Sequence, residues 1–260
     1  MDKTILSVKN LCAGYDNKEI LHRISLNFDS GKVIAIVGPN GCGKSTLLKT
    51  LLGIIPCVDG EVYADGMNVL SSKRKEVARR IAHLSQGKST PDMTVEQMVL
   101  HGRFPHLDYP RRYSARDRQI ALDAMKTVGI SEYAQYPISS LSGGMRQSAY
   151  IAMALAQDTE YIILDEPTTY LDISHQLHLM RTLRELADRG KGIIAVMHDL
   201  PIAFTFSDTV VVMNGGKIIS QKTPAETCCS DIVIDIFVVR MHFENNEYLY
   251  EIKPDGKKEP

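Results

Sequence analysis

The hydrophobic residues near the N-terminus follow two patterns. From residue 24 to residue 28 they alternate with polar residues, which is the period of a strand with one buried face. Residues 33–37 are all apolar, as in a strand that is buried on both faces. After a glycine-rich stretch, leucines recur at helical spacing at positions 47, 48, 51 and 52, and Gly53 is placed to end that helix. The pattern predicts a strand, a glycine loop and a helix in succession.

The segment from residue 87 to residue 158 has a different character, because helical spacing dominates it. Thr94 followed by Gln97 is the capping-box pair of a helix start. Ile120, Ala124 and Val128 lie on one face of a second helix. Residues 102–114 are rich in proline, arginine and tyrosine and predict a loop. We expect a helical insertion that separates two halves of an α/β core.

Strands and helices alternate again after residue 160. Residues 161–164 form a short apolar run that ends at Asp165 and Glu166. A helical pattern around residues 179–186 ends at Gly190, and residues 192–197 form another buried strand that stops before His198. Residues 209–213 and 217–220 predict a hairpin with an Asn-Gly-Gly turn. Strands that alternate with helices predict a mainly parallel sheet.

Composition and charge exclude several classes of protein. The 260 residues carry 30 Lys and Arg against 31 Asp and Glu, a formal charge of -1, so there is no general attraction for nucleic acid. No apolar run approaches the roughly 18–20 residues that span a bilayer, and the N-terminus lacks the apolar core of a signal peptide. The five cysteines are odd in number and form no CxxC pair, which favours free thiols in a reducing cytosol. We therefore expect a chain that is neither membrane-spanning nor secreted.

Residues 38–45 match the phosphate-loop pattern G-x-x-x-x-G-K-[ST] without a mismatch. Its glycines let backbone N–H groups surround phosphate oxygens, and the helix that follows points its positive end at the same anion. Lys44 is expected to reach the β- and γ-phosphates, and Ser45 to bind Mg²⁺. We interpret Cys42 as tolerated at a free position and not as catalytic. The predicted ATP-binding residues of this segment are Gly38, Pro39, Asn40, Gly41, Cys42, Gly43, Lys44, Ser45 and Thr46.

Two further motifs carry candidate chemistry. Asp165 and Glu166 follow an apolar strand, at the sheet edge where ligands of parallel sheets collect. Asp165 suits a carboxylate associated with Mg²⁺, and Glu166 could accept a proton from an attacking water. The run Leu141-Ser142-Gly143-Gly144 precedes a helix rich in alanine, where backbone N–H groups could hold a second anion. Such motifs are common at the starts of helices. They indicate a site only when they occur together in one chain.

The order of these motifs resembles the nucleotide-binding subunit of an ABC transporter. The resemblance extends over residues 5–219, through the phosphate loop, Ser142 with its glycines, Asp165-Glu166 and His198. It implies a P-loop NTPase core with a mainly parallel sheet, an N-terminal antiparallel β part and an inserted helical subdomain. It divides the chain into 1–86 with the phosphate loop, 87–158 with the signature motif, and 159–260 with the rest of the core and a tail. It also implies ATP hydrolysis with Mg²⁺.

The resemblance also implies roles for individual residues. Tyr15 matches the aromatic residue that stacks on adenine, and Gln86 matches the glutamine that senses Mg²⁺ and the membrane partner. Asp172 matches the loop that couples two sites, and His198 the switch histidine at the γ-phosphate. The signature residues Ser142, Gly143 and Gly144 would contact the γ-phosphate held by an opposite subunit. Each has a structural alternative: a packed aromatic, an exposed loop glutamine, a core histidine or an ordinary helix cap. The catalytic set is Glu166, His198, Gln86 and Lys44, and the Mg²⁺ set is Ser45, Gln86 and Asp165.

Two residues depart from the family pattern. The signature usually reads LSGGQ, but Met145 stands at the glutamine position. Met153 stands where the family commonly has arginine. Because the serine and glycines that would contact phosphate remain, we expect the chain to be active. The polar support at the mouth of the site is what the first departure puts in question.

The insertion resembles one group of importers, those for iron–siderophore, haem and cobalamin complexes. Residues 102–106 are similar to its GRxPH segment and residues 171–176 to its LDISHQ stretch. The resemblance implies a polytopic membrane permease, a second ATP-binding subunit that packs head to tail, and an indirect role for a substrate-binding protein. The chain would then sit at the cytoplasmic face of the membrane, attached through a groove near Gln86 and Arg103.

Alternatives remain for the histidines, the arginines and the assembly. Metal ligation could explain His101, His106, His175 and His178, although no third ligand lies near them in sequence. Nucleic-acid binding could explain the arginines, but interleaved Asp108 and Asp117 favour a permease-facing or solvated surface. That arginine set is Arg103, Arg111, Arg112, Arg116 and Arg118. A soluble ABC machine, not coupled to transport, is the alternative to an importer.

Overall fold

A central six-stranded sheet organises the computed structural model, which describes all residues except 1–4, 16–17, 86–89, 170, 246 and 253–260. Its strand order is β10-β9-β3-β8-β7-β6, and every neighbouring pair except β10 with β9 is parallel. This confirms the predicted mainly parallel sheet. The bounds are β3 Val33–Val37, β6 Ile81–Leu84, β7 Tyr161–Asp165, β8 Gly192–Val196, β9 Thr209–Asn214 and β10 Lys217–Lys222.

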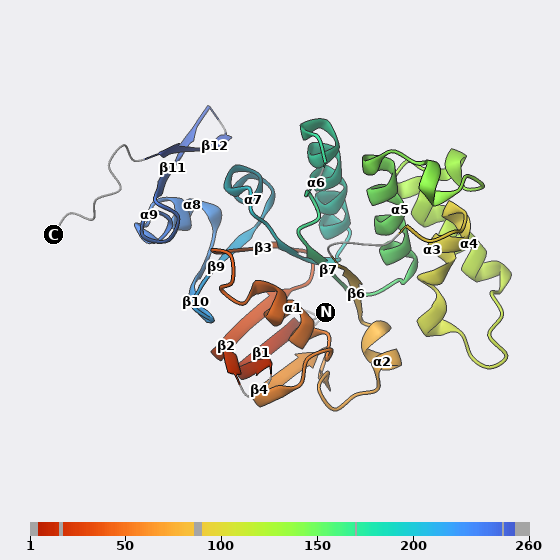
Figure 1. Ribbon diagram of the computed structural model, residues 1–260, viewed down its shortest axis with the longest axis horizontal. Helices are drawn as coiled ribbons and strands as arrows, with labels where there is room; N and C mark the ends of the chain where they lie inside the picture. The colour runs from red at the N-terminus through yellow and green to blue at the C-terminus, as the bar shows by residue number, and fades with distance from the viewer. Residues whose placement is uncertain (1–4, 16–17, 86–89, 170, 246, 253–260) are drawn as a thin grey trace.

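An antiparallel sheet of order β2-β1-β4-β5 packs beside the central one (Figure 1). Its strands are β1 Ile5–Tyr15, β2 Lys18–Asp29, β4 Cys57–Ala64 and β5 Met67–Asn68. The predicted alternation appears in β2, where Ile24, Leu26 and Phe28 are buried and the residues between them are exposed. The N-terminal antiparallel part of the fold is therefore confirmed.

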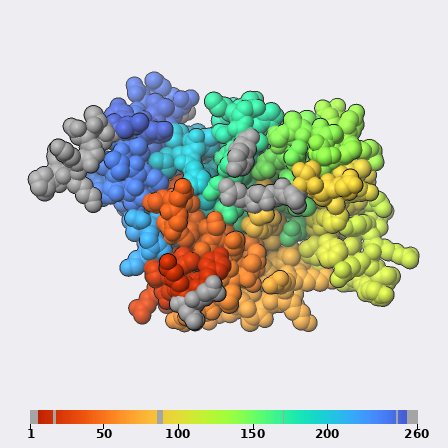
Figure 2. Space-filling model, in the orientation of Figure 1, coloured from red at the N-terminus to blue at the C-terminus, as the bar shows by residue number. Residues whose placement is uncertain are grey.

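Helices pack against the central sheet, and further helices form both ends of the molecule. The α-helices are α1 Lys44–Leu51, α2 Arg74–Ala78, α3 Val95–His101, α4 Ala115–Thr127, α5 Gly143–Ala156, α6 Ile173–Asp188, α7 Leu200–Phe206, α8 Pro224–Cys228 and α9 Ile232–Phe237. Figures 1 and 2 show the group α3 to α5 at one end of the molecule and the C-terminal elements at the other. Gly53 adopts φ 65 directly after the last residues of α1, as a residue that ends a helix does.

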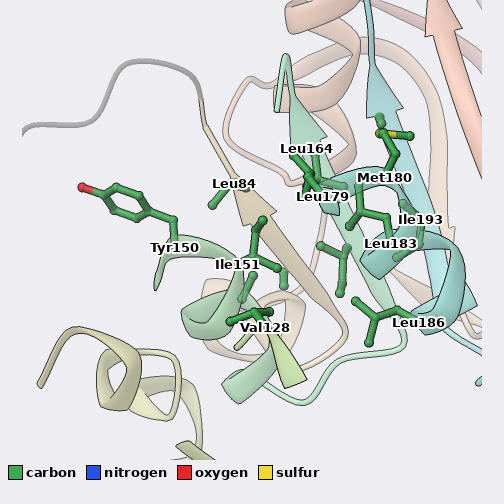
Figure 3. Close-up of a cluster of buried hydrophobic side chains, with 14 of the residues drawn as sticks. Leu84, Val128, Tyr150, Ile151, Leu164, Leu179, Met180, Leu183, Leu186 and Ile193 are labelled. Atoms are coloured by element: carbon green, nitrogen blue, oxygen red, sulfur yellow. The ribbon is translucent and has the colours of Figure 1, made fainter. Parts of the chain in front are cut away.

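The alternation of side chains along each central strand divides the core into two layers. In β3, Ile34 and Ile36 face the leucines of α1 and the antiparallel sheet, whereas Val33 and Ala35 face the helices of the other side. Figure 3 shows this second layer, where the α6 side chains Leu179 and Leu183 lie near Leu164 of β7 and Ile193 of β8. Burial on both faces explains why these strands read as continuous apolar runs.

The helical segment agrees with its predicted start but not with its predicted loop. Thr94 Oγ1 accepts a hydrogen bond from Gln97 N at 3.3 Å and Gln97 Oε1 accepts one from Thr94 N at 3.0 Å, the two halves of a capping box. Residues 102–114 are not loop throughout, because the 3₁₀ helix η1 spans Phe104–His106. Two more short 3₁₀ helices, η2 Ser131–Tyr133 and η3 Ile138–Ser140, lie before α5.

The C-terminal elements were not predicted. After β10 the chain forms α8, α9 and an antiparallel hairpin of β11 Val239–Glu244 and β12 Glu247–Ile252. Tyr248 of this hairpin packs edge-on against Phe204 of α7, with ring centroids 5.6 Å apart. The hairpin therefore packs against α7, with Met241 as its buried residue.

Candidate active site

The glycine loop connects the end of β3 to α1 and is built for a close backbone approach. Gly41 and Gly43 have φ of 76 and 103, which side chains disfavour. A Cβ on Gly38 would lie 2.3 Å from Met213 O, so only glycine fits there. Helix α1 begins at Lys44, and Gly43 before it has no side chain that could cap the helix. Its first N–H groups are therefore left for another acceptor.

Lys44 extends back over this loop. Its side chain is almost fully buried, and Nζ donates to Gly38 O at 2.7 Å and to Pro39 O at 2.9 Å. Both acceptors are uncharged carbonyls, so an anion at the loop would gain a charge interaction that these bonds do not supply. The loop and its lysine fit a polyphosphate. Burial raises the pKa of the neighbouring Cys42 thiol more than Lys44 lowers it, which agrees with an unreactive cysteine.

Ser45 and Asp165 meet although 120 residues separate them in the chain. Ser45 Oγ donates to Asp165 Oδ1 at 3.3 Å, because β7 ends beside the start of α1. Burial raises the pKa of Asp165 above its usual range, and the hydrogen bond from Ser45 offsets this only in part. A hydroxyl and a carboxylate that is costly to leave charged form a suitable oxygen donor set for a divalent cation such as Mg²⁺.

Glu166 and His198 come together from the neighbouring strands β7 and β8. His198 Nε2 lies 2.5 Å from Glu166 Oε1, and Thr169 Oγ1 donates to Glu166 Oε2 at 3.4 Å. Glu166 has φ of 51, in the left-handed region that is costly for a residue other than glycine. Its carboxylate is largely shielded while the His198 ring is more open. The pair could hold and receive a proton at the sheet edge that ends in Asp165.

The signature residues lie in a different part of the molecule, at the start of α5. Figure 1 shows α5 among α3 and α4, beyond β6 from the phosphate loop. Ser142 caps the helix, because its Oγ accepts a hydrogen bond from Met145 N at 3.3 Å. Ser142 and Gly143 are exposed. Within this chain the two predicted anion cradles are therefore separate.

The remaining predicted site residues have varied positions. Asp172 is exposed and caps α6, since its Oδ1 accepts a hydrogen bond from His175 N at 2.9 Å. Hydrogen bonds from the backbone and the ring of His175 lower the pKa of Asp172. Tyr15 is exposed at the end of β1. Gln86 lies outside the described residues.

The structure corrects the expectation for Arg103, which is not part of a surface. Its side chain is buried, and Nε lies 2.9 Å from Asp117 Oδ1 while Nη1 donates to Ala156 O at 2.9 Å. Burial would raise the pKa of Asp117, but hydrogen bonds from Ser114 and the Arg103 ion pair outweigh it and lower the pKa to about 2. Arg103 therefore fixes the end of α5 to α4, and cannot face a permease.

The structure shows what Met145, Met153 and His106 contact. Met145 and Met153 are partly buried and pack against the second core layer. His106 bonds through Nε2 to Gln157 O at 2.8 Å. Among the described residues no group of three or more His, Cys, Asp and Glu side chains forms a metal site, and no helix is long and apolar enough to span a bilayer.

Sequence reasoning missed the contacts that join α5 to the segment after β7. Gln147 Nε2 of α5 donates to Pro167 O at 3.0 Å. The His175 ring bonds to Asp172 and lies against Gly144. His175 belongs to the LDISHQ stretch and was weighed as a metal ligand, but neither contact was predicted. The sole available signal was the Asp-x-x-His spacing at a predicted helix start.

The comparisons with known proteins agree with this geometry. A family model described as ABC transporter matches residues 21–169, more than half of the chain. The iron(3+)-hydroxamate import ATP-binding protein of Bacillus subtilis (strain 168) is 40% identical over 236 residues, 90% of this chain and 88% of the relative. The ferric enterobactin transport ATP-binding protein of Escherichia coli (strain K12) is 40% identical over 234 residues, 89% of this chain and 86% of the relative.

Solved structures show the same architecture. A metal-chelate type ABC transporter in an inward-facing conformation superposes with a TM-score of 0.82 at 25% identity, over 98% of this chain and 99% of that chain. An ATP-binding cassette in its ADP conformation superposes with a TM-score of 0.82 at 24% identity, over 90% of this chain and 98% of that chain. The second likeness concerns the fold alone.

Proposed function

Because this chain belongs to the ABC transporter family and is an ATP-binding ATPase, we propose that it powers import of a metal chelate through a membrane permease. The observation that carries the proposal is 40% identity, along almost the full length, to subunits named for iron-hydroxamate and ferric enterobactin import. Among the three chelates implied by the sequence, these relatives favour an iron–siderophore complex over haem or cobalamin.

We assign ATP binding to the phosphate loop. Backbone N–H groups of residues 41–45 and the ammonium of Lys44 hold the β- and γ-phosphates, and the exposed ring of Tyr15 stacks on adenine. Ser45 and Asp165, with Gln86, would hold Mg²⁺, which supplies charge for the phosphate oxygens when it is bound. The uncapped start of α1 and the buried ammonium support this assignment.

We assign hydrolysis to the pair at the ends of β7 and β8. Glu166 accepts the proton of the attacking water, because its carboxylate is shielded and held by Thr169 and His198. His198 contacts the transferred phosphoryl group with its more open ring. Lys44 and the phosphate loop stabilise the charge that develops there.

The signature residues act on a second copy of the site. Ser142, Gly143 and Gly144 lie apart from the phosphate loop of their own chain, so they would meet a nucleotide only in a head-to-tail dimer. Asp172 lies at the loop that couples the two sites. The permease would hold this dimer at the cytoplasmic face of the membrane and receive its closure, while a substrate-binding protein acts on the permease from the other side.

Transport in proteoliposomes tests the proposal. The chain is reconstituted with a candidate permease, with ATP enclosed in the vesicle lumen. Labelled ferric hydroxamate, ferric catecholate, haem and cobalamin are then added outside with a binding protein, and their uptake is compared. We expect uptake of an iron–siderophore complex that stops with Glu166→Gln. ATP hydrolysis without uptake of any of the four would contradict metal-chelate import and favour a soluble ABC machine.

A further inference from the structure

His175 lies between two loops of the proposed site and touches both. Its ring Nδ1 is 2.8 and 2.9 Å from the two carboxylate oxygens of Asp172. On its other side the ring packs against Gly144, where a Cβ would lie 2.1 Å from Cδ2 and 2.6 Å from Cγ and Nε2 of the ring. Asp172 therefore holds the ring in position. Because the ring lies so close to residue 144, only glycine fits there.

A second contact links the same two parts of the chain. Gln147, the fifth residue of α5, donates from Nε2 to Pro167 O at 3.0 Å. Pro167 follows Glu166, and Asp172 ends the same segment, so α5 is attached near both ends of residues 166–172. Gln176 of α6 also holds this segment, because its Nε2 donates to Thr168 O and to Leu171 O. Two attachment points fix a short segment more firmly than one, because its rotation is also restrained.

We propose that His175 is a positioning residue that holds the Asp172 loop against Gly144, so that the signature loop and the segment carrying Glu166 move together. This inference rests on the proposed function, in which both parts act on nucleotide. His175 itself touches neither reacting atoms nor phosphate. It keeps Asp172 and the start of α5 in position. The rate of ATP hydrolysis depends steeply on such positioning.

His175→Ala can test this role without a large loss of stability, because it keeps the cap of α6. Asp172 caps α6 through the backbone N of residue 175, which His175→Ala retains. The side chain of His175 is about half exposed, so its removal takes little apolar surface from the core. We expect His175→Ala to unfold at nearly the wild-type temperature and to keep its ATP affinity, because the phosphate loop lies elsewhere. Its kcat should fall roughly 10- to 100-fold.

A conservative variant provides the first decisive measurement. His175→Asn replaces the ring Nδ1–H by a side-chain N–H that can donate to Asp172 from the same helix position. We expect His175→Asn to recover most of the kcat that His175→Ala loses, with KM for ATP unchanged in both. The proposal is overturned if asparagine is as slow as alanine, or if the loss appears in KM.

A double-mutant cycle with Gly144→Ala provides the second. The new Cβ keeps the backbone N–H of residue 144 but must displace the His175 ring, which breaks the bonds to Asp172. Gly144→Ala, His175→Ala and the double variant should therefore show similar kcat values, with the double no slower than either single. Effects that multiply would show that residues 144 and 175 act independently and would refute the link.

His178→Ala is the matched control, because it removes another exposed histidine of α6, which lines a small pocket together with His175 and Gly144. It should leave kcat within about two-fold of wild type, since surface substitutions change little. All variants are measured as ATP hydrolysis by the full chain bound to its permease. Failure to transport a chelate would refute the cargo and leave these kinetics intact. A pattern of kinetics other than that expected would refute only the role of His175.

Discussion

Two glycine loops in this protein precede helices, and the structure builds them differently. The loop before α1 has no side-chain cap, contains two residues at positive φ, and is covered by the buried ammonium of Lys44. The loop before α5 is capped by its own Ser142, and both Ser142 and Gly143 are exposed. By pattern alone both are anion cradles at helix starts.

The difference indicates a division of labour between the loops. The first loop leaves N–H donors unused and holds a cation against uncharged acceptors, so we expect it to carry most of the affinity for ATP. The second has satisfied one of its donors and faces outward, so we expect it to contribute only when another molecule covers it. Binding and turnover should then respond separately to changes in the two loops.

The largest effect is expected from Glu166→Gln, which preserves shape but removes the base. Turnover should fall about 10²- to 10⁴-fold, the usual contribution of general acid–base catalysis, while ATP affinity stays close to wild type. Phosphate release and equilibrium ATP binding measure the two quantities. Asp199→Asn is the control, because this carboxylate neighbours His198 and only caps α7. Turnover of Glu166→Gln at the wild-type rate would show that another group is the base.

The next effect concerns the scaffold of the second loop. Arg103→Ala leaves Asp117 buried without its ion pair and removes a donor from Ala156 O at the end of α5. We expect the free energy of unfolding to fall by roughly 3–5 kcal/mol, as when one partner of a buried pair is removed. Denaturant unfolding measures it. The exposed pair of Arg118 with Glu96 is the control, and Arg118→Ala should cost less than about 1 kcal/mol.

The Arg103 pair also predicts a pH dependence of stability. The pKa of Asp117 is lowered to about 2 in the folded state, so its contribution is present above the unfolded value of 3.8. It is lost as the pH falls towards 2, and over that range it amounts to about 2 kcal/mol. Unfolding curves between pH 5 and pH 2 should show this loss in wild type and a smaller one in Arg103→Ala. Equal slopes would mean that Arg103 does not hold the carboxylate charged.

Lys44→Ala tests the first loop directly. Removal of the buried ammonium should weaken ATP binding by roughly 1.5–3 kcal/mol, about 10- to 100-fold, the range for hydrogen bonds to charged groups. Calorimetric titration at fixed salt measures the change. Lys49→Ala is the matched control, because Lys49 is exposed in the last turn of the same helix. If Lys44→Ala weakens ATP binding no more than the control does, the first loop does not carry most of the affinity for ATP.

Local features of the fold and site were predictable because short-range rules determine them. The capping box of Thr94 and Gln97, the phosphate loop and the hairpin after residue 208 all depend on residues a few positions apart. The contact of Ser45 with Asp165 needed the strand order, in which β8 lies between β3 and β7. No strand order was predicted, and the expectation that both residues lie near the phosphate rested only on the rule that ligands collect at the carboxyl edge of a parallel sheet.

Features that depend on long-range contacts were missed or misassigned. Arg103 was grouped with surface arginines because its partners, Asp117 and the Ala156 carbonyl, lie 14 and 53 residues away. Strand β11 alternates apolar and polar residues, with Met241 buried, but the resemblance ended at residue 219. Its burial depends on Phe204, which nothing local to the hairpin reveals. The boundaries at residues 86 and 158 and the roles of the site residues stay predictions.

The smallest expected effect is that of Ser142→Ala, and it is the sharpest test of the comparison. Loss of the cap on Met145 N should lower the free energy of unfolding by about 1 kcal/mol. ATP affinity of the isolated chain should not change, because Ser142 lies apart from the phosphate loop that binds the nucleotide. Ser142→Asp keeps an oxygen that caps the helix but has no hydroxyl to donate to a phosphate, so it separates the two roles. If Ser142→Ala weakens ATP binding as much as Lys44→Ala does, the two loops are equivalent. If turnover falls while ATP affinity does not, and aspartate restores stability without restoring turnover, the exposed serine acts on a nucleotide held by another chain.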